Sequence, residues 1–141
     1  MSTAMLLARC GEFVVAFPLA GVLEVVAAPV PGAPDPRCRG WRGLLAWRGA
    51  PVPLVDLRDR LGAPADDPPR HAVVCACGEA RVALAVDHVD GLGTIEAAPG
   101  NATLPGVPRL ARAGDRFAVI LAPGDLFGAA EQALLAAERV A

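Results

Sequence analysis

The sequence predicts an all-β protein, a barrel or a sandwich of short strands, with one helix at the C-terminal end. Apolar segments of strand length recur roughly every ten residues, with turn signals between them. Hydrophobic residues make up 54% of the 141 residues but aromatic residues only 4%, so Val, Leu and Ala must fill the core. The 14 Pro and 15 Gly divide the chain into pieces that favour strands and turns over long helices.

Length and charge limit the classes of function. A chain of 141 residues is expected to form a single domain over residues 1–141, without disulfides or metals to stabilise its core. The net charge is −2, and the 13 basic residues are scattered among 15 acidic ones, which disfavours nucleic-acid binding. No segment approaches the ~20 apolar residues of a membrane span, and no basic region precedes the short apolar run at the N-terminus. We therefore expect a soluble, cytoplasmic protein.

The N-terminal part is predicted to contain two strands and a long loop. Residues 12–17 are the first strand candidate, and residues 19–29 read as a turn that leads into a second strand. Residues 29–43 are so rich in Pro and Gly that neither a helix nor a strand can persist, and this segment is expected to run over the surface.

A hairpin is predicted in the middle of the chain. The strand candidates LLAW and VPLVDL flank Arg48-Gly49-Ala50, where Gly49 permits the positive φ that a tight turn needs. Pro51 and Pro53 remove two donors from their strand, which suits an edge strand or a strand entry and not the centre of a sheet. The following LRDRLG is predicted to be a short helical turn that ends at Gly62.

The C-terminal half continues the pattern of short strands and adds the helix. Its predicted elements are a loop at 63–69, strands at 71–77 and 81–92 joined by a hairpin turn, an irregular segment from Thr94 to Pro108, two short strands around Ala113-Gly114-Asp115, and a helix at 128–141. The helix has only a modest apolar stripe, so it is expected to dock on the domain as a cap and not to seek a partner.

The sequence offers little that could catalyse a reaction. Its hydroxyl groups and its two histidines lie in no activating motif. Asp87 and Asp90 bracket His88, but polar residues where a strand meets its turn are typical of a solvated strand end. We therefore expect no enzyme activity and no cofactor.

A metal or redox site is the alternative from another class of function. Cys75 and Cys77 alternate along a strand, and His71 is in phase with both, so the three side chains share one face. However, a single CxC without a second Cys pair is a weak signal for zinc. We expect no bound metal and regard the four cysteines as small buried hydrophobes, while a small metal- or redox-sensing β-protein remains open.

Aromatic and arginine side chains point to protein binding instead. Trp41, Arg42, Trp47 and Arg48 lie close together beside the proline-rich loop, and Trp and Arg are enriched at the energetic centres of protein interfaces. Trp47 could equally belong to the core. Trp41 is expected to be exposed.

Along nearly its whole length the chain resembles the CheW-like domain of bacterial chemosensory systems. The segments that carry this resemblance are EFVVAFPLAGVLEVV, GLLAWRGAPVPLVDLRDRLG, HAVVCACGEARVALAVDHVDGL and RAGDRFAVILAPGDLF. The Arg-Gly turn followed by VPLVDLR is the most specific of them. The resemblance implies two small five-stranded SH3-like barrels packed together. It also implies a non-enzymatic adaptor that couples the cytoplasmic tips of methyl-accepting chemoreceptors to the regulatory domain of a CheA-type histidine kinase.

The resemblance also implies a set of partner-binding residues. Arg48 and Gly49 match the family's Arg-Gly turn near the receptor-contacting groove, and Asp56 matches an Asp that we expect to be structural. Physically, an Arg fork suits carboxylates or helix-end carbonyls, while Gly lets a receptor helix approach the backbone. The full set of expected partner-binding residues is Glu24, Val25, Arg48, Gly49, Val89 and Gly91.

The chain departs from the family pattern in three places. Ala46-Trp47 stands where the family usually has Asn-Leu before Arg-Gly, and Cys38 and Trp41 occupy a loop that usually holds an Ile or a Val-Gly. The segment from Thr94 to Gly106 is shorter than in the family and lacks the usual Ile-x-Pro element, and the resemblance implies that this neighbourhood contributes to the kinase contact. The alternative within the family is therefore an adaptor that binds receptors but not the kinase, and so limits or reshapes the receptor array.

Overall fold

The computed structural model describes residues 2–63, 66–97, 109–113 and 116–137. Its strands are β1 (Ser2–Cys10), β2 (Phe13–Pro18), β3 (Val22–Ala27), β4 (Trp41–Trp47), β5 (Ala50–Asp56), β6 (His71–Cys77), β7 (Ala80–Val86), β8 (His88–Ala97), β9 (Arg109–Ala113) and β10 (Arg116–Ile120). The helices are η1 (Leu19–Gly21), α1 (Leu57–Arg60), α2 (Pro123–Leu126) and α3 (Ala129–Ala137).

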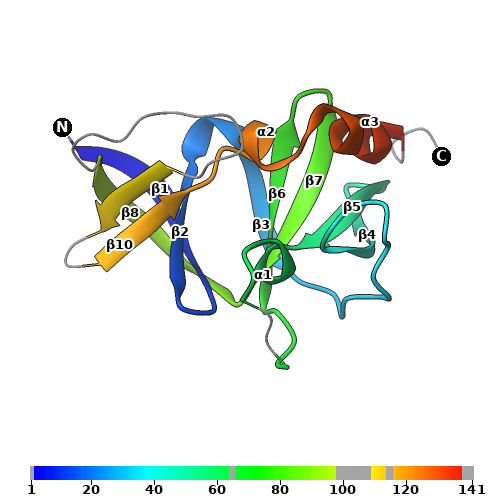
Figure 1. The fold of residues 1–141 in the computed structure, drawn as a ribbon, viewed down its shortest axis with the longest axis horizontal. Coiled ribbons are helices and arrows are strands. Elements are labelled where there is room, and N and C mark those ends of the chain that lie inside the picture. Colours follow the sequence, from blue (N-terminus) through cyan, green and yellow to red (C-terminus); the bar gives the residue numbers. More distant parts are fainter. Residues whose placement is uncertain (1, 64–65, 98–108, 114–115, 138–141) are drawn as a thin grey trace.

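The strands form two five-stranded units that lie next to each other (Figure 1). The first is a closed barrel in the order β1-β2-β10-β9-β8, and the second is a sheet in the order β3-β6-β7-β5-β4. The chain leaves the barrel after β2, builds the second sheet, and returns through β8. The predicted all-β class with paired five-stranded units is confirmed.

Most predicted elements are present, but β1 was missed. The first strand predicted from the sequence starts at residue 12, whereas β1 occupies Ser2–Cys10 and pairs with both β2 and β8. Its Ala, Met and Leu residues lack the β-branched and aromatic character of a typical strand. Strand pairing on both edges stabilises it, and such long-range pairing is invisible to local pattern.

The prediction of an irregular segment from Thr94 to Pro108 is wrong for its first residues. Strand β8 continues through Thr94 to Ala97, and its residues pair with β1 and β9. Residues 98–108 lie outside the described residues. The two short strands predicted around residues 113–115 are confirmed as β9 and β10, and the residues between them are not described.

The two prolines of β5 lie in an internal strand, contrary to the edge position that they suggested. β5 sits between β4 and β7, but its pairing with β7 starts only at Leu54. In the two-residue hairpin, Pro51 and Pro53 fall at the positions that exchange no hydrogen bonds with β4. The nitrogens of Pro51 and Pro53 therefore point away from β4, toward the side where β7 pairs with β5 only from Leu54 onward. The two prolines thus lie at the entry of the strand, which is the second of the two predicted positions.

Trp41 is buried, and the prediction that it is exposed was wrong. It is the first residue of β4, is only 4% exposed, and its Nε1 donates a 2.9 Å hydrogen bond to the Gly43 carbonyl. Cys38, just before it, is 1% exposed. The proline-rich loop thus runs over the surface for most of its length but turns inward at its end, because a large apolar ring gains most from burial.

The second sheet is buried on both faces. Val52, Leu54 and Val74 fill its own interior. Neighbouring residues on the opposite face, such as Val55 and Leu84, join a second cluster that also contains Phe17 of the barrel. This explains why β5, β6 and β7 read as nearly continuous apolar runs instead of alternating with polar residues. One shared core therefore holds the two units together.

Helix α3 docks as the sequence predicts. It packs beside β7 (Figure 1). Its Leu135 is fully buried in the shared core. Arg60 of α1 donates two hydrogen bonds to Glu131, at 3.0 and 3.1 Å, and another to the Leu126 carbonyl. Its guanidinium carbon also lies 4.6 Å from the Phe127 ring centroid. A single arginine thus attaches the C-terminal helices to the end of β5.

Candidate functional site

The turn between β4 and β5 is held in an uncommon conformation. Arg48 has φ 51° and Gly49 φ 77°, which is the type I′ geometry that two-residue hairpins favour. Glycine adopts such angles freely, but a residue with a Cβ pays about 1–2 kcal/mol. Among the described residues, Arg48 is the only one other than glycine with a positive φ. The strand pairing fixes this turn and leaves the Arg48 side chain 70% exposed.

Trp47 lies at the base of a small cluster that three strands build. The indole is 6% exposed, and its Nε1 donates to Glu24 Oε1 at 3.2 Å. The guanidinium carbon of Arg48 lies 4.8 Å from the indole centroid, and that of Arg81, from β7, lies 5.4 Å from it. We call Glu24, Trp47, Arg48 and Arg81 the Trp47 cluster. The open question about Trp47 is thereby answered, because the ring belongs to the core and also supports surface arginines.

A bulge in β3 positions Glu24. The register between β3 and β6 shifts between Val22 and Glu24, which leaves Leu23 as the extra residue, 41% exposed. Bulges often redirect a side chain next to a functional site. Glu24 Oε1 accepts from both Trp47 Nε1 and Arg48 Nη2, the latter at 3.1 Å. The cluster therefore contains two guanidinium groups and a single carboxylate.

The structure brings together only part of the expected site. Glu24 and Arg48 are in direct contact, Gly49 completes the same turn, and Val25 is half-buried and packs on the shared core. Val89 and Gly91 belong to β8 of the barrel, at a bulge where β1 pairs with β8. The backbone N–H of Val89 donates to His71 Nδ1 at 2.9 Å.

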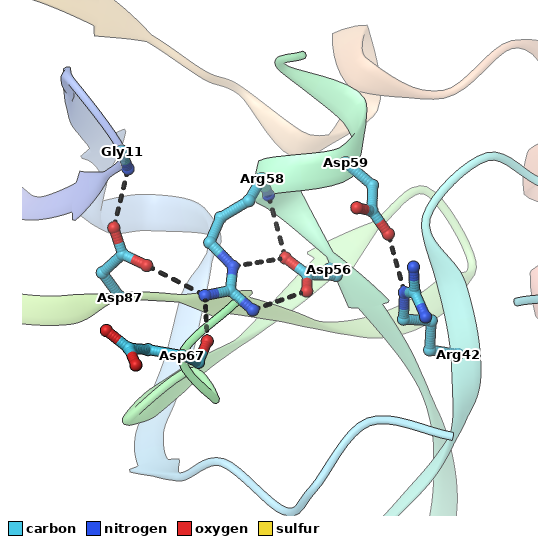
Figure 2. A network of polar contacts seen from close by, with 7 residues as sticks. All are labelled: Gly11, Arg42, Asp56, Arg58, Asp59, Asp67 and Asp87. Carbon is cyan, nitrogen blue, oxygen red and sulfur yellow. Dashed lines mark hydrogen bonds and ion pairs between the residues drawn. The ribbon is translucent and has the colours of Figure 1, made fainter. Parts of the chain in front are cut away.

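Asp56 has a structural environment, as the matched family position leads us to expect. It is 4% exposed and caps α1 by accepting from the Arg58 backbone N–H. The Arg58 guanidinium donates two hydrogen bonds to the same carboxylate, at 3.0 and 2.9 Å (Figure 2). Arg58 is itself 3% exposed, and the pKa of its side chain is raised, chiefly by these hydrogen bonds that it donates to Asp56.

The Arg58 network extends across the junction of the two units. Arg58 also donates to the Asp67 carbonyl at 2.7 Å and to Asp87 Oδ1 at 3.1 Å. Asp87 joins β7 to β8, and its other oxygen accepts from the Gly11 backbone N–H in the β1–β2 turn (Figure 2). A polar chain therefore connects the second sheet, the crossover and the barrel. Asp87 thus takes part in structure, and His88 is paired with Asp90 at 2.8 Å.

The candidate metal ligands do not converge. His71, Cys75 and Cys77 do share a face of β6, as their spacing predicts. However, the Cys75 thiol donates to the Val73 carbonyl and the Cys77 thiol to the Pro123 carbonyl, while His71 Nδ1 accepts from Val89. Burial raises the pKa of Cys75 to about 12, which opposes the thiolate that a metal needs. Within the described part of the chain, no three His, Cys, Asp or Glu side chains are grouped to hold a metal ion.

Sequence reasoning missed two arginines that the structure makes prominent. Arg81 lies far along the chain from Trp47, and Arg58 lies far from Asp87. In the sequence, Arg58 stands out only as the last residue of the VPLVDLR motif and Arg81 only as one of the scattered basic residues. For Arg58, a local signal was present, since Asp56 and Arg58 stand at the end of a strand and the start of a helical turn, where an Asp commonly caps the helix. For Arg81, no local signal exists.

Comparison with known proteins identifies the family. Residues 4–131 match the CheW-like domain family, and the chain therefore belongs to that family. Among solved structures, it is similar to the scaffolding protein TtCheW from Thermoanaerobacter tengcongensis, with a TM-score of 0.74 and 22% sequence identity over 96% of this chain and 99% of that one. No curated protein matches the chain. Among the helices of the described residues, none is long and apolar enough to cross a membrane.

Proposed function

We propose that this protein is a non-enzymatic adaptor of a chemosensory system. It binds the cytoplasmic tips of methyl-accepting chemoreceptors and couples them to a CheA-type histidine kinase, in the cytoplasm at receptor arrays. The observation that carries the proposal is the match to the CheW-like domain family over residues 4–131. The Arg48-Gly49 turn supports it, because a costly backbone conformation holds an exposed arginine at the position where the family resemblance puts the receptor contact.

The chemistry of this surface suits a helical partner. Arg48 presents a planar fork of donors that can engage a carboxylate or the free carbonyls at a helix end. Gly49 has no side chain, and a Cβ built on it meets no atom within 4 Å, so a partner can approach the backbone closely. Glu24, Val25, Arg48 and Gly49 form the receptor-facing part of the proposed site, and Val89 and Gly91 the part contributed by β8.

A capture experiment tests the proposal. Purified protein should retain a chemoreceptor cytoplasmic signalling fragment, under conditions in which an established coupling adaptor retains it. Arg48→Ala should weaken this binding by about 1–3 kcal/mol if Arg48 is an energetic centre of the interface. Arg39→Ala removes another exposed arginine and serves as the control. If the wild-type protein retains no receptor fragment, the proposed function is wrong.

A second candidate function rests on the segment from Thr94 to Gly106. There the chain is shorter than the family pattern and lacks the Ile-x-Pro element. Loss of one or two anchoring residues could remove ~2–4 kcal/mol, enough to turn a micromolar contact into one near millimolar. Such a protein would bind receptors but not the kinase, and would cap or reshape the array instead of extending it.

Titration calorimetry with the kinase regulatory domain distinguishes the two functions. A clear low-micromolar isotherm supports the full coupling adaptor and contradicts the receptor-only form. If no binding is detected, a longer family-type segment grafted between Gly93 and Leu104 should create it. Failure of that graft would show that the kinase contact depends on other residues.

A further inference from the structure

The Trp47 cluster has an uneven distribution of charge. Its two arginines, Arg48 and Arg81, lie within 4.8 and 5.4 Å of the centroid of one indole ring. Its single carboxylate, Glu24, contacts Arg48 Nη2 and the indole Nε1. Because Glu24 is the single carboxylate of the cluster and is paired with Arg48, the other guanidinium has no counter-charge among the described residues.

That charge belongs to Arg81. Its side chain is exposed on β7, and none of the ion pairs in the described part of the chain includes it. Trp47 restrains the group, because a guanidinium is attracted to the face of an indole. Arg81 is therefore a cation that a buried ring restrains and whose N–H donors have no partner among the residues that the structure describes.

We propose that Arg81 is a specificity-determining residue that binds an acidic side chain of the partner protein beside Arg48. The inference rests on the proposed receptor-binding function and adds the chemical nature of the contact. A guanidinium that is already restrained loses less conformational entropy when it forms a bidentate pair with a carboxylate. Arg48 and Arg81 approach the same ring, so one partner segment can engage both.

The cluster selects partners by charge as well as by shape. A segment with an Asp or Glu opposite Arg81 meets its counter-charge, whereas one with a Lys or Arg there meets two guanidinium groups and is repelled. The carboxylate of Glu24 partly neutralises the charge of Arg48, so most of the positive potential at this surface comes from Arg81. Arg81 thus discriminates between acidic and basic partners. Arg48 is already paired with Glu24, so its contribution to binding depends less on the charge of the partner.

Binding of a receptor cytoplasmic signalling fragment to Arg81→Gln tests this role. Arg81→Gln should weaken binding about tenfold, because a hydrogen-bonded ion pair is lost, and should reduce the dependence of affinity on NaCl concentration. Arg39→Gln makes the same change of charge at an exposed arginine away from the cluster and should match the wild type. Equal thermal unfolding midpoints for the two variants exclude a folding defect.

Charge reversal identifies the acidic residue. Arg81→Glu should lose binding to the native receptor fragment. One of the fragments in which each exposed Asp or Glu is replaced in turn by Arg should restore it. If the wild type binds the receptor and Arg81→Gln binds as well as Arg39→Gln, the role of Arg81 is refuted while the proposed function stands. If the wild type binds no receptor fragment, both are refuted.

Discussion

Arg48 satisfies two demands that usually conflict, a turn conformation that suits glycine and a side chain that suits recognition. Its φ of 51° is imposed by the hairpin, and its guanidinium is held against Trp47 and Glu24. Natural proteins tolerate such local cost at functional positions. The conformational and the binding contributions of this residue should therefore be separable by mutation.

Substitutions at Arg48 should separate the two contributions. Arg48→Ala removes the side chain but keeps a Cβ at positive φ, whereas Arg48→Gly removes both. We expect Arg48→Gly to unfold with a free energy about 1 kcal/mol higher than that of Arg48→Ala, measured by chemical denaturation. Both variants should lose receptor binding to a similar extent. Equal stabilities would contradict the assigned turn geometry.

Buried thiols should make the protein sensitive to alkali. Burial raises the pKa of Cys75 from its usual 9.0 to about 12. The folded state therefore keeps a proton that the unfolded state releases, so this contribution is present below pH 9 and is lost as the pH rises toward 12.

Cys75→Ala should remove that part of the pH dependence. Between pH 7 and pH 10.5, the free energy of unfolding of the wild type should fall relative to that of Cys75→Ala by up to about 2 kcal/mol. Chemical denaturation at both pH values measures the difference. A constant difference between the two proteins would show that Cys75 is accessible to solvent in the folded state.

At the scale of elements, the sequence was informative wherever the signal was local. The hairpin at Arg48-Gly49 follows from turn chemistry, and α1 follows from the polar residues after β5 and from Gly62. β1 and the last residues of β8 were missed, since pairing with distant strands stabilises them. Trp41 was misplaced because a loop rich in proline suggested exposure, while an adjacent apolar core was available to bury the ring.

The candidate site divides in the same way. Glu24, Arg48 and Gly49 could be assigned from the family resemblance, and the structure joins the first two. Arg81 could not be found, because its contact with Trp47 depends on how β7 and β4 are arranged in the sheet. Arg58 and Asp87 are 29 residues apart, and only the fold brings them together.

The ionised carboxylate of Glu131 should stabilise the docking of α3, in addition to the buried Leu135. Arg60 lowers the pKa of Glu131 through its hydrogen bonds, so the ionised form stabilises the folded state. This contribution is present above the usual carboxyl pKa of 4.5 and is lost as the pH falls below it. Glu131→Gln should therefore destabilise the protein by about 1 kcal/mol at pH 7, since the pair is partly exposed.

The pH dependence separates this ion pair from packing. The difference in free energy of unfolding between the wild type and Glu131→Gln should shrink as the pH falls below 4.5. Hydrogen exchange should also become faster in α3. Glu12→Gln, at an exposed carboxylate of the β1–β2 turn, is the control. A difference that persists at pH 3 would mean that Glu131 acts through its shape alone.

At the scale of the whole molecule, two kinds of contact hold the barrel and the second sheet together. One is the shared core, in which Phe17 of the barrel and Leu84 of the second sheet belong to the same cluster. The other is the polar chain from Arg58 through Asp87 to Gly11 (Figure 2). Apolar packing tolerates small sliding, whereas hydrogen bonds to a buried guanidinium have a defined direction. We therefore predict that the polar chain contributes more than the apolar core to how the two units are oriented.

Asp87 should matter more than an aspartate whose ion-pair partner is exposed, because its partner Arg58 is buried. Asp87→Ala removes one of the two carboxylates that the buried Arg58 guanidinium contacts and removes the acceptor of the Gly11 N–H. We expect a loss of about 2 kcal/mol in the free energy of unfolding, since the Asp87 side chain itself is 29% exposed. Asp87→Asn keeps an oxygen for Gly11 and should lose less. Asp59→Asn breaks the Arg42–Asp59 pair, whose side chains are 30% and 22% exposed, and should cost at most about 1 kcal/mol.

Hydrogen exchange and binding to two partners test whether this chain orients the two units. Exchange of the Gly11 amide should accelerate in Asp87→Ala, less in Asp87→Asn, and not at all in Asp59→Asn. The geometry of the receptor-facing and kinase-facing surfaces should depend on the angle between the units. Asp87→Asn should then weaken simultaneous binding of both partners more than binding of either one alone, because binding of the first partner no longer favours the orientation that the second one needs. An Asp87→Asn protein with wild-type exchange at Gly11 and unchanged joint binding would leave orientation to the apolar core.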